Sequence, residues 1–247
     1  MGGITLLRDV ARRAAGYLPA RVELQLRVAR SRRILGGFYA PGAELSALVP
    51  KGKIAIDAGA NVGVYSYWIA RSATQLTAFE PQPRLAKRLA ASGIKGLTVH
   101  NVALSDAVGV AELHVPQAHG EASLRNLDVP VDTIRVPLTT VDSFGLADVG
   151  FFKVDVEGHE EPLLHGAEQT LRKSSACVYI EIEERHNPGG LFRIVAWLAD
   201  LGYTDVQFRQ GGAMHPIAEF DLERDQLQQR PRTPMYANNF MFRRPLR

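Results

Sequence analysis

The chain has 247 residues, of which 46% are hydrophobic and 22% are charged, and its formal net charge is +3. This composition is that of an ordinary globular protein, and the length is sufficient for one α/β domain with a full core. With no run of 18 apolar residues, no apolar signal-peptide core and a single cysteine, Cys177, the sequence argues against a membrane span, a secretory signal and an internal disulfide, so we expect a cytoplasmic protein.

Residues 1–40 are predicted to form a basic arm ahead of a domain at 41–247. Residues 1–33 hold eight arginines against Asp9 and Glu23. Apolar residues in the arm have a helical spacing at Leu6, Leu7, Val10, Ala14 and Leu18 and a strand-like alternation at Val22, Leu24, Leu26 and Val28. A basic arm favours an anionic partner such as nucleic acid, lipid head groups or an acidic substrate. The alternative is a solvated flank that wraps the domain or a second copy of the chain.

The next feature is a strand, a glycine turn and a helix. An apolar run at 54–56 is followed by Gly59 and Gly63, and residues 62–71 can then form a helix. The glycines allow positive φ and a close approach of the backbone to a bound molecule, at which the amides of the helix start point. Asp57 ends the strand there, and a carboxylate suits a cationic or hydroxyl-bearing group better than a phosphate.

A second acid follows at the end of the next apolar run. Glu80 lies about 20 residues further on, where an acid that binds a ribose diol is expected. The turn lacks the G-x-G-x-x-G spacing of dinucleotide sites. Glycines and two acids together predict an adenosine site without a pyrophosphate. The alternative is a generic glycine turn with two solvated acids.

The remaining elements continue the alternation of strands and helices. Helices are predicted at 43–49, 83–91, 160–171 and 190–201, and strands at 97–102, 149–154, 178–182, 205–208 and 239–242. This order predicts a parallel sheet with right-handed crossovers and with ligands at the carboxyl ends of its strands. After the third strand, Asn101, Ala103, Leu104 and Asp106 can bracket a purine ring. Residues 210–234 are predicted to be loop with one short helix at 222–227.

The alternation breaks at residues 108–137, where only short strands are predicted, at 110–115 and 134–137. A long polar segment inside a domain usually has a function. We therefore interpret 116–137 as a substrate loop or lid with Ser123 and Arg125 as substrate contacts. A passive insertion is the alternative.

Acids and histidines gather at the ends of two later strands. The first group is Asp155, Glu157 and His159, and the second is Glu181, Glu183 and His186. His159 is the first candidate for a general base because histidine titrates near neutral pH, and Glu157 is the second. His159 can instead be a helix N-terminal residue bonded to a neighbour, and His186 can orient a substrate or lie on the surface. A divalent ion that binds a sugar diol could be held by Asp155, Glu157, His159, Glu181 and Glu183, but no zinc spacing is present and the metal is left unassigned.

Taken in order, these residues resemble the FkbM-type methyltransferases, a branch of the class I S-adenosylmethionine-dependent fold. The matching pieces span about residues 50–185 and are Asp57-Ala-Gly-Ala-Asn-Val-Gly63, Phe79-Glu-Pro81, Ala103-Leu-Ser-Asp106, Thr140-Val-Asp142, Lys153-Val-Asp-Val-Glu-Gly-His-Glu160, Gly166-Ala167 and Ile180-Glu-Ile-Glu183. The family often has valine where Ala58 stands. The resemblance implies a Rossmann-like α/β sandwich, with helices on both faces of a seven-stranded, mostly parallel sheet whose last strand is antiparallel.

The resemblance also implies a cofactor site. S-adenosylmethionine would lie over the glycine turn, with Glu80 on the ribose, Asp106 or the Ala103 backbone on the adenine, and Asp57 and Asp155 at the amino-acid end. The remaining expected cofactor contacts are Gly59, Ala60, Asn61, Gly63, Tyr65 and Pro81. Many relatives methylate hydroxyls of sugars, polyketides or other secondary metabolites, and S-adenosylhomocysteine would be the second product.

We therefore expect O-methylation of a small-molecule acceptor. Two alternatives stay open, a nucleic-acid methyltransferase and a non-catalytic adenosine-binding domain, each using the basic arm. A nicotinamide dehydrogenase is disfavoured, because the third glycine and a Tyr/Lys pair for hydride transfer are missing.

Overall fold

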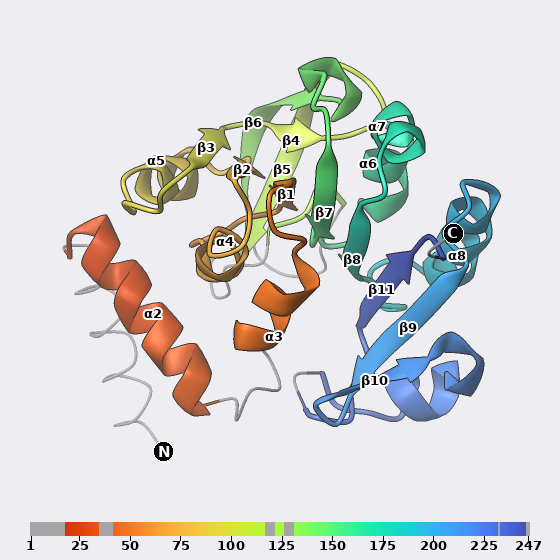
Figure 1. Ribbon diagram of the computed structural model, residues 1–247. Helices are drawn as coiled ribbons and strands as arrows, with labels where there is room; N and C mark the ends of the chain where they lie inside the picture. The colour runs from red at the N-terminus through yellow and green to blue at the C-terminus, as the bar shows by residue number, and fades with distance from the viewer. Residues whose placement is uncertain (1–17, 35–41, 117–121, 126–130, 232, 246–247) are drawn as a thin grey trace.

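A large sheet forms the centre of the computed structural model, which describes residues 18–34, 42–116, 122–125, 131–231 and 233–245 (Figure 1). Its eight strands have the order β10-β9-β11-β8-β7-β1-β2-β3. Their bounds are β1 Ile54–Ala58, β2 Gln75–Phe79, β3 Leu97–His100, β7 Val149–Val154, β8 Cys177–Glu181, β9 Asp205–Gln210, β10 Ala213–Pro216 and β11 Asn239–Arg243.

The strand directions confirm the mostly parallel sheet with an antiparallel last strand. β3, β2, β1, β7 and β8 pair in parallel, and β11 runs antiparallel between β8 and β9. Seven strands were expected in this sheet, and the described residues form eight. The additional strand is β10, which lies within residues 210–234, predicted to be loop, and pairs with β9. Gly211 and Gly212 have φ values of 59° and 87°, which permit this tight hairpin.

Helices cover both faces of the sheet, as expected. On one face lie α2 Ala20–Ile34, α3 Gly42–Leu48, α4 Val64–Ile69 and α5 Pro83–Ala90, and on the other α6 Glu160–His165, α7 Glu168–Lys173 and α8 Gly190–Asp200. Neighbouring residues of one strand belong to different cores: Phe151 is in the buried cluster that contains Leu24 and Trp68, whereas Phe152 is in the cluster that contains Leu163. Nearly every residue of the central strands is buried, which explains their continuous apolar runs.

Helix α2 corrects the strand-like alternation predicted at residues 22–28. Leu24 and Val28, one helical turn apart, are buried against the core. Glu23 accepts hydrogen bonds from Arg27 one turn later, at 2.7 and 2.9 Å. The two buried residues and the two ion-paired residues are each four positions apart, as in a helix, so the alternation of aliphatic residues in the sequence does not indicate a strand here. Of the helical stripe predicted from Leu6 to Leu18, only Leu18 is described, and it lies in a bend just before α2.

A small second sheet occupies the region where the alternation breaks. It consists of β4 Ala103–Leu104, β5 Gly109–Pro116 and β6 Val131–Thr139, in the order β4-β6-β5. β5 and β6 form an antiparallel pair, which confirms both predicted strands and extends them. Residues 117–121 and 126–130 of the predicted lid lie outside the described residues.

Three further short helices lie at Asp142–Phe144, Ile217–Glu219 and Glu223–Leu227, and the last confirms the helix expected at 222–227. None of the described helices is long and apolar enough to cross a membrane.

The helix predicted at 160–171 is divided into α6 and α7 around Gly166. A Cβ atom at Gly166 would lie 1.9 Å from the Ser105 carbonyl oxygen, so glycine permits the close contact with the end of β4. Asp142 then caps the new start of α7. Its carboxylate accepts hydrogen bonds from the amides of Gln169 and Thr170, at 2.9 and 2.8 Å, and from the Thr170 hydroxyl, at 2.7 Å.

We predict that Asp142→Ala lowers the free energy of unfolding by about 1–2 kcal/mol, because the α7 amides lose their acceptors. Asp142→Asn is the matched control, since it keeps one side-chain oxygen and should lose less than half as much. Chemical denaturation of the three proteins measures the difference. An alanine variant as stable as the wild type would show that the cap contributes nothing.

Candidate active site

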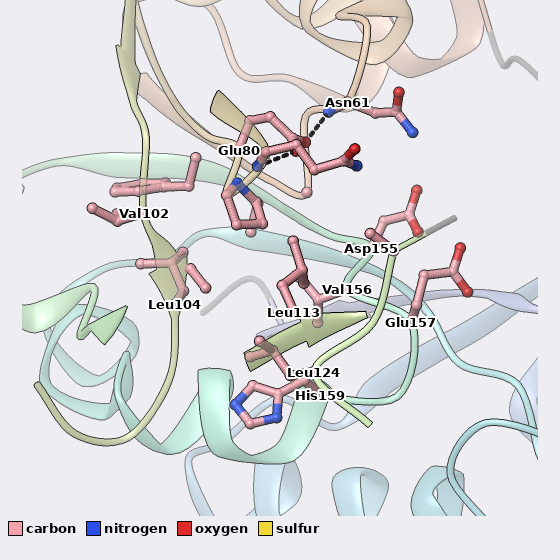
Figure 2. A pocket seen from close by; sticks show the side chains of 17 residues that line it. Asn61, Glu80, Val102, Leu104, Leu113, Leu124, Asp155, Val156, Glu157 and His159 are labelled. Carbon is pink, nitrogen blue, oxygen red and sulfur yellow. Dashed lines mark hydrogen bonds between the residues drawn. The ribbon is translucent and has the colours of Figure 1, made fainter. Parts of the chain in front are cut away.

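An open pocket of about 670 Å³ lies at the carboxyl ends of β1, β2 and β7 (Figure 2). The lining residues are Ala58, Gly59, Asn61, Phe79, Glu80, Pro81, Gln82, Val102, Ala103, Leu104, Leu113, Ala122, Leu124, Asp155, Val156, Glu157 and His159. One side is therefore apolar, and the other carries carboxylates.

The glycine turn after β1 is held against both neighbouring strands. Gly59 has a φ of 74°, and a Cβ atom there would lie 1.8 Å from the Asp155 carbonyl oxygen, so no other residue can occupy the position without moving β7. The amides of Gly59 and Ala60 donate to the Phe79 carbonyl at 3.0 and 3.1 Å. Gly63 has a different role, because a Cβ atom there would meet Leu89 of α5 at 2.5 Å.

Glu80 is a buried carboxylate fixed by backbone amides. Only 3% of the residue is exposed, and its two oxygens accept hydrogen bonds from the amides of Asn61 and Gln82, at 2.7 and 2.9 Å (Figure 2). Burial raises the pKa of Glu80 to about 7, although the two amide donors lower it. Asn101 donates its side-chain amide to the carbonyls of Glu80 and Pro81, so it supports this acid.

Lys153 joins two of the predicted acids and was not among the residues predicted for the site. Its ammonium group lies 3.5 Å from Asp57 and 3.1 Å from Asp155, and 4.6 Å from the centre of the Tyr65 ring. Burial lowers the pKa of Lys153, but the charges of Asp155 and Asp57 outweigh it and the net pKa is raised. Lys153 is therefore charged, although only 2% of it is exposed.

Asp57 lies beneath the pocket and does not line it. The residue is fully buried, and Ser66 of α4 donates its hydroxyl to one carboxylate oxygen. The other oxygen, Oδ1, accepts no hydrogen bond from the described residues and has only the Lys153 ion pair. Among the other predicted cofactor contacts, Ala60, Gly63, Tyr65 and Asp106 do not line the pocket either, whereas Gly59, Asn61, Pro81, Ala103 and Asp155 do.

Asp155 and Glu157 follow β7, and their carboxylates point to the same side of the pocket (Figure 2). Glu157 has a positive φ of 51°, and its carboxylate lies 2.9 Å from His186 Nδ1. Burial raises the pKa of Glu157, against the hydrogen bond from His186, which lowers it. Glu157 and His186 thus form a pair that can share a proton beside Asp155.

His159 also lines the pocket, but at a different place. Its Nε2 atom lies 3.0 Å from the Ser105 hydroxyl, next to the end of β4. In Figure 2 its ring lies beyond Leu124 from the two carboxylates. Burial lowers the pKa of His159, so the ring is neutral at pH 7. The two candidate bases, His159 and Glu157, therefore belong to opposite sides of the pocket.

The predicted substrate contacts Ser123 and Arg125 tie the chain between β5 and β6 to the site. Ser123 donates its hydroxyl to the Glu157 carbonyl at 2.7 Å, and Arg125 donates to the His186 carbonyl. Neither side chain lines the pocket, whereas their neighbours Ala122 and Leu124 do. Through these hydrogen bonds, Ser123 and Arg125 hold in place the part of the pocket wall that Ala122 and Leu124 form.

Glu181 is the last residue of β8 and Glu183 follows two residues later, and neither lines the main pocket. Asn238 donates to both, at 2.6 and 3.0 Å, and Tyr236 donates to Glu183 at 3.0 Å. Burial, together with the charges of Asp155, Glu157 and Glu183, raises the pKa of Glu181 well above its usual range. A second hollow of about 310 Å³ adjoins them, and its polar lining includes Arg209, Gln210, Tyr236, Asn238 and Asn239. Within the described ranges, no three or more His, Cys, Asp or Glu side chains are grouped so that they could hold a metal ion.

We predict that Glu80 makes stability depend on pH. Its pKa is about 7 in the folded protein and 4.5 ordinarily, so between these values the folded state binds more protons than the unfolded state. Stability relative to Glu80→Gln should therefore fall as pH rises from about 4.5 to about 7, by on the order of 3 kcal/mol, and then level off. Denaturation of both proteins across this range measures it. Parallel pH profiles would contradict the raised pKa.

Comparisons with family profiles and solved structures identify proteins that this chain resembles. The profile of the methyltransferase FkbM domain matches residues 57–204. A methyltransferase FkbM from Methylobacillus flagellatus KT is 14% identical with a TM-score of 0.52, and the match covers 97% of this chain but only 60% of that one. An rRNA methylase from Streptococcus thermophilus is 13% identical (TM-score 0.45, 81% of this chain and 91% of that one). A protein from Streptococcus mutans in complex with SAH is 14% identical (TM-score 0.41, 81% and 90%).

The likeness to the methyltransferase FkbM structure from Methylobacillus flagellatus KT shows that this chain shares its fold, the Rossmann-like fold of class I methyltransferases. A search of curated protein sequences gave no match. The family profile covers more than half of the chain, and it includes the glycine turn, Glu80 and the acids after β7. The chain therefore belongs to the FkbM family of S-adenosylmethionine-dependent methyltransferases.

Proposed function

We propose that this protein transfers a methyl group from S-adenosylmethionine to a hydroxyl group of a small polar acceptor. The observation that carries the proposal is the pocket in which the glycine turn, the buried Glu80 and the Asp155 carboxylate meet at neighbouring strand ends. Gly59 leaves no side chain between the turn and β7. A carboxylate pair without a phosphate-binding loop suits a nucleoside that carries an amino acid.

The residues present match the parts of this cofactor. Glu80 would accept hydrogen bonds from the ribose hydroxyls, and the apolar wall of Val102, Ala103 and Leu104 would contact the base. Asp155 would attract the ammonium group of the cofactor's amino-acid end, and Lys153, 3.1 Å away, partly offsets the negative charge of Asp155. When bound, S-adenosylmethionine supplies a methyl group on a positively charged sulfur. The protein then mainly has to position the acceptor and receive its proton.

Glu157 with His186 is our choice for the group that accepts this proton. Both carboxylates after β7 point to one side, so Glu157 lies beside the residue assigned to the amino-acid end of the cofactor. His159 instead contacts Ser105, near the assigned adenine wall. The raised pKa of Glu157 brings it closer to neutral pH, which improves a carboxylate as a base. His186 would act as a positioning residue.

The second hollow supports a polar acceptor. It lies at the ends of β9 and β11, and Asn238 connects it to Glu181 and Glu183 through hydrogen bonds. Guanidinium and amide groups such as those of Arg209 and Asn239 bind hydroxyl oxygens. An acceptor that spans from Glu157 toward this hollow would be rich in oxygen, as a sugar is.

We predict that S-adenosylhomocysteine stabilises the wild type by about 2.7 kcal/mol at a concentration 100 times its Kd, which raises the melting temperature. Glu80→Ala should abolish this shift because the ribose contacts are lost. Glu112→Ala, which removes an exposed acid on β5, is the control and should keep it. Absence of a shift in the wild type would refute the cofactor assignment.

We predict that Glu157→Gln lowers kcat roughly 10²–10⁴-fold, as expected for loss of a general base. His186→Asn should lower kcat less and shift its pH profile, and His159→Ala should stay within about tenfold of the wild type. Turnover of a hydroxylated acceptor identified from a panel of glycosides and polyketides provides the measurement. The opposite order, with His159 essential and Glu157 dispensable, would return the base to His159.

A further inference from the structure

The two parts of the chain differ strongly in charge. Residues 1–105 contain 15 lysines and arginines against 5 acids, whereas residues 106–247 contain 14 against 21. Between Asp57 and Asp106 the only acid is Glu80, which is buried. A protein whose net charge is only +3 therefore carries a concentrated positive charge in its first part.

Helices α2 and α5 bring this positive charge to one surface. Arg88 of α5 forms an ion pair with Glu23 of α2 and donates to the Leu18 carbonyl at 2.9 Å. At Gly93, after α5, a Cβ atom would lie 3.5 Å from Arg21 Cδ. The two helices therefore contact one another, on the side of the molecule opposite α8, β9 and β10 (Figure 1).

The exposed side chains here form what we call the basic face. Its cations are Arg21, Arg27, Arg30, Arg84, Lys87 and Lys95. The only acid on α2 and α5 is Glu23, which is 8% exposed and already bound to Arg27 and Arg88. Of the six cations, Arg27 is paired with Glu23, and the described residues of α2 and α5 hold no other acid that could compensate the rest.

Helix α2 also exposes two aliphatic side chains. Leu26 is 56% exposed and Val22 is 40% exposed, one turn apart on α2, whereas Leu24 and Val28 are buried in the core. Basic side chains around exposed aliphatic ones are the features by which a surface helix binds anionic lipid and enters the boundary between head groups and acyl chains. Neither α2 nor α5 contains an aromatic residue on which a nucleic-acid base could stack.

We propose that the basic face binds an anionic lipid surface. α5 begins at Pro83, directly after Pro81 and Gln82, which line the candidate active site. Binding through this face would therefore hold the site next to the membrane. The inference goes beyond methyl transfer, because it depends on charge and exposure and not on the cofactor.

Co-sedimentation with vesicles tests the proposal. The full-length wild type should bind vesicles of phosphatidylcholine with phosphatidylglycerol, should not bind phosphatidylcholine alone, and should dissociate as salt rises. The triple variant Arg30→Gln, Arg84→Gln, Lys87→Gln should bind roughly a hundredfold more weakly, since each basic side chain near an anionic surface contributes about 1 kcal/mol. Leu26→Gln should weaken binding several-fold.

The matched control neutralises three exposed cations elsewhere, with Arg135→Gln, Lys173→Gln and Arg230→Gln. It should bind vesicles as the wild type does. The thermal shift with S-adenosylhomocysteine, measured on every variant, shows whether the fold and the cofactor site are retained. The proposal would be overturned if the wild type did not bind anionic vesicles, or if both triple variants lost vesicle binding to the same extent. Binding to RNA but not to vesicles would reassign the face to nucleic acid.

Discussion

The site depends on the ammonium group of Lys153, which lies between two carboxylates in the core of the sheet. Asp57 and Lys153 are register partners on β1 and β7, so their side chains share one face of the sheet. Asp155 directly follows β7, and its carboxylate lies 3.1 Å from the ammonium. Without the cation, the fully buried Asp57 carboxylate would have no compensating charge and would lie near the partly exposed carboxylate of Asp155, which is strongly unfavourable. The ion pairs therefore allow acids at two neighbouring strand ends.

The backbone around this cluster is equally constrained. Gly59 brings the β1 turn into contact with the Asp155 carbonyl, and the Phe79 carbonyl holds the turn against β2. Asn61, within the turn, donates its amide to Glu80. Three strand ends are thus linked through short backbone contacts. The result is a pocket whose acids are fixed by the sheet, while its apolar wall comes from the smaller sheet and from residues 122–124.

The sequence predicted those site residues that directly follow an apolar run, because such a run marks where a buried strand ends. Gly59, Glu80 and Asp155 follow apolar runs, so their placement at one sheet edge could be predicted. Lys153 could not, because a lysine inside a strand gives no sign that its charge points at two acids across the sheet. Asn238 and Tyr236 were missed for a related reason: more than fifty residues separate them from Glu183, and only the antiparallel β11 brings them together. Helix α2 could not be recognised, because its aliphatic residues occupy every second position from Val22 to Val28, which is the pattern of a strand, although only Leu24 and Val28 are buried.

A crystal structure with S-adenosylhomocysteine tests the central claim most directly, namely that Glu80 and the Asp155 carboxylate paired with Lys153 hold the cofactor. Our account predicts the ribose hydroxyls within hydrogen-bond distance of Glu80 and the amino group beside Asp155, with the sulfur facing Glu157. Ligand density elsewhere, or in this pocket with the ribose away from Glu80 and the amino group away from Asp155, would contradict it.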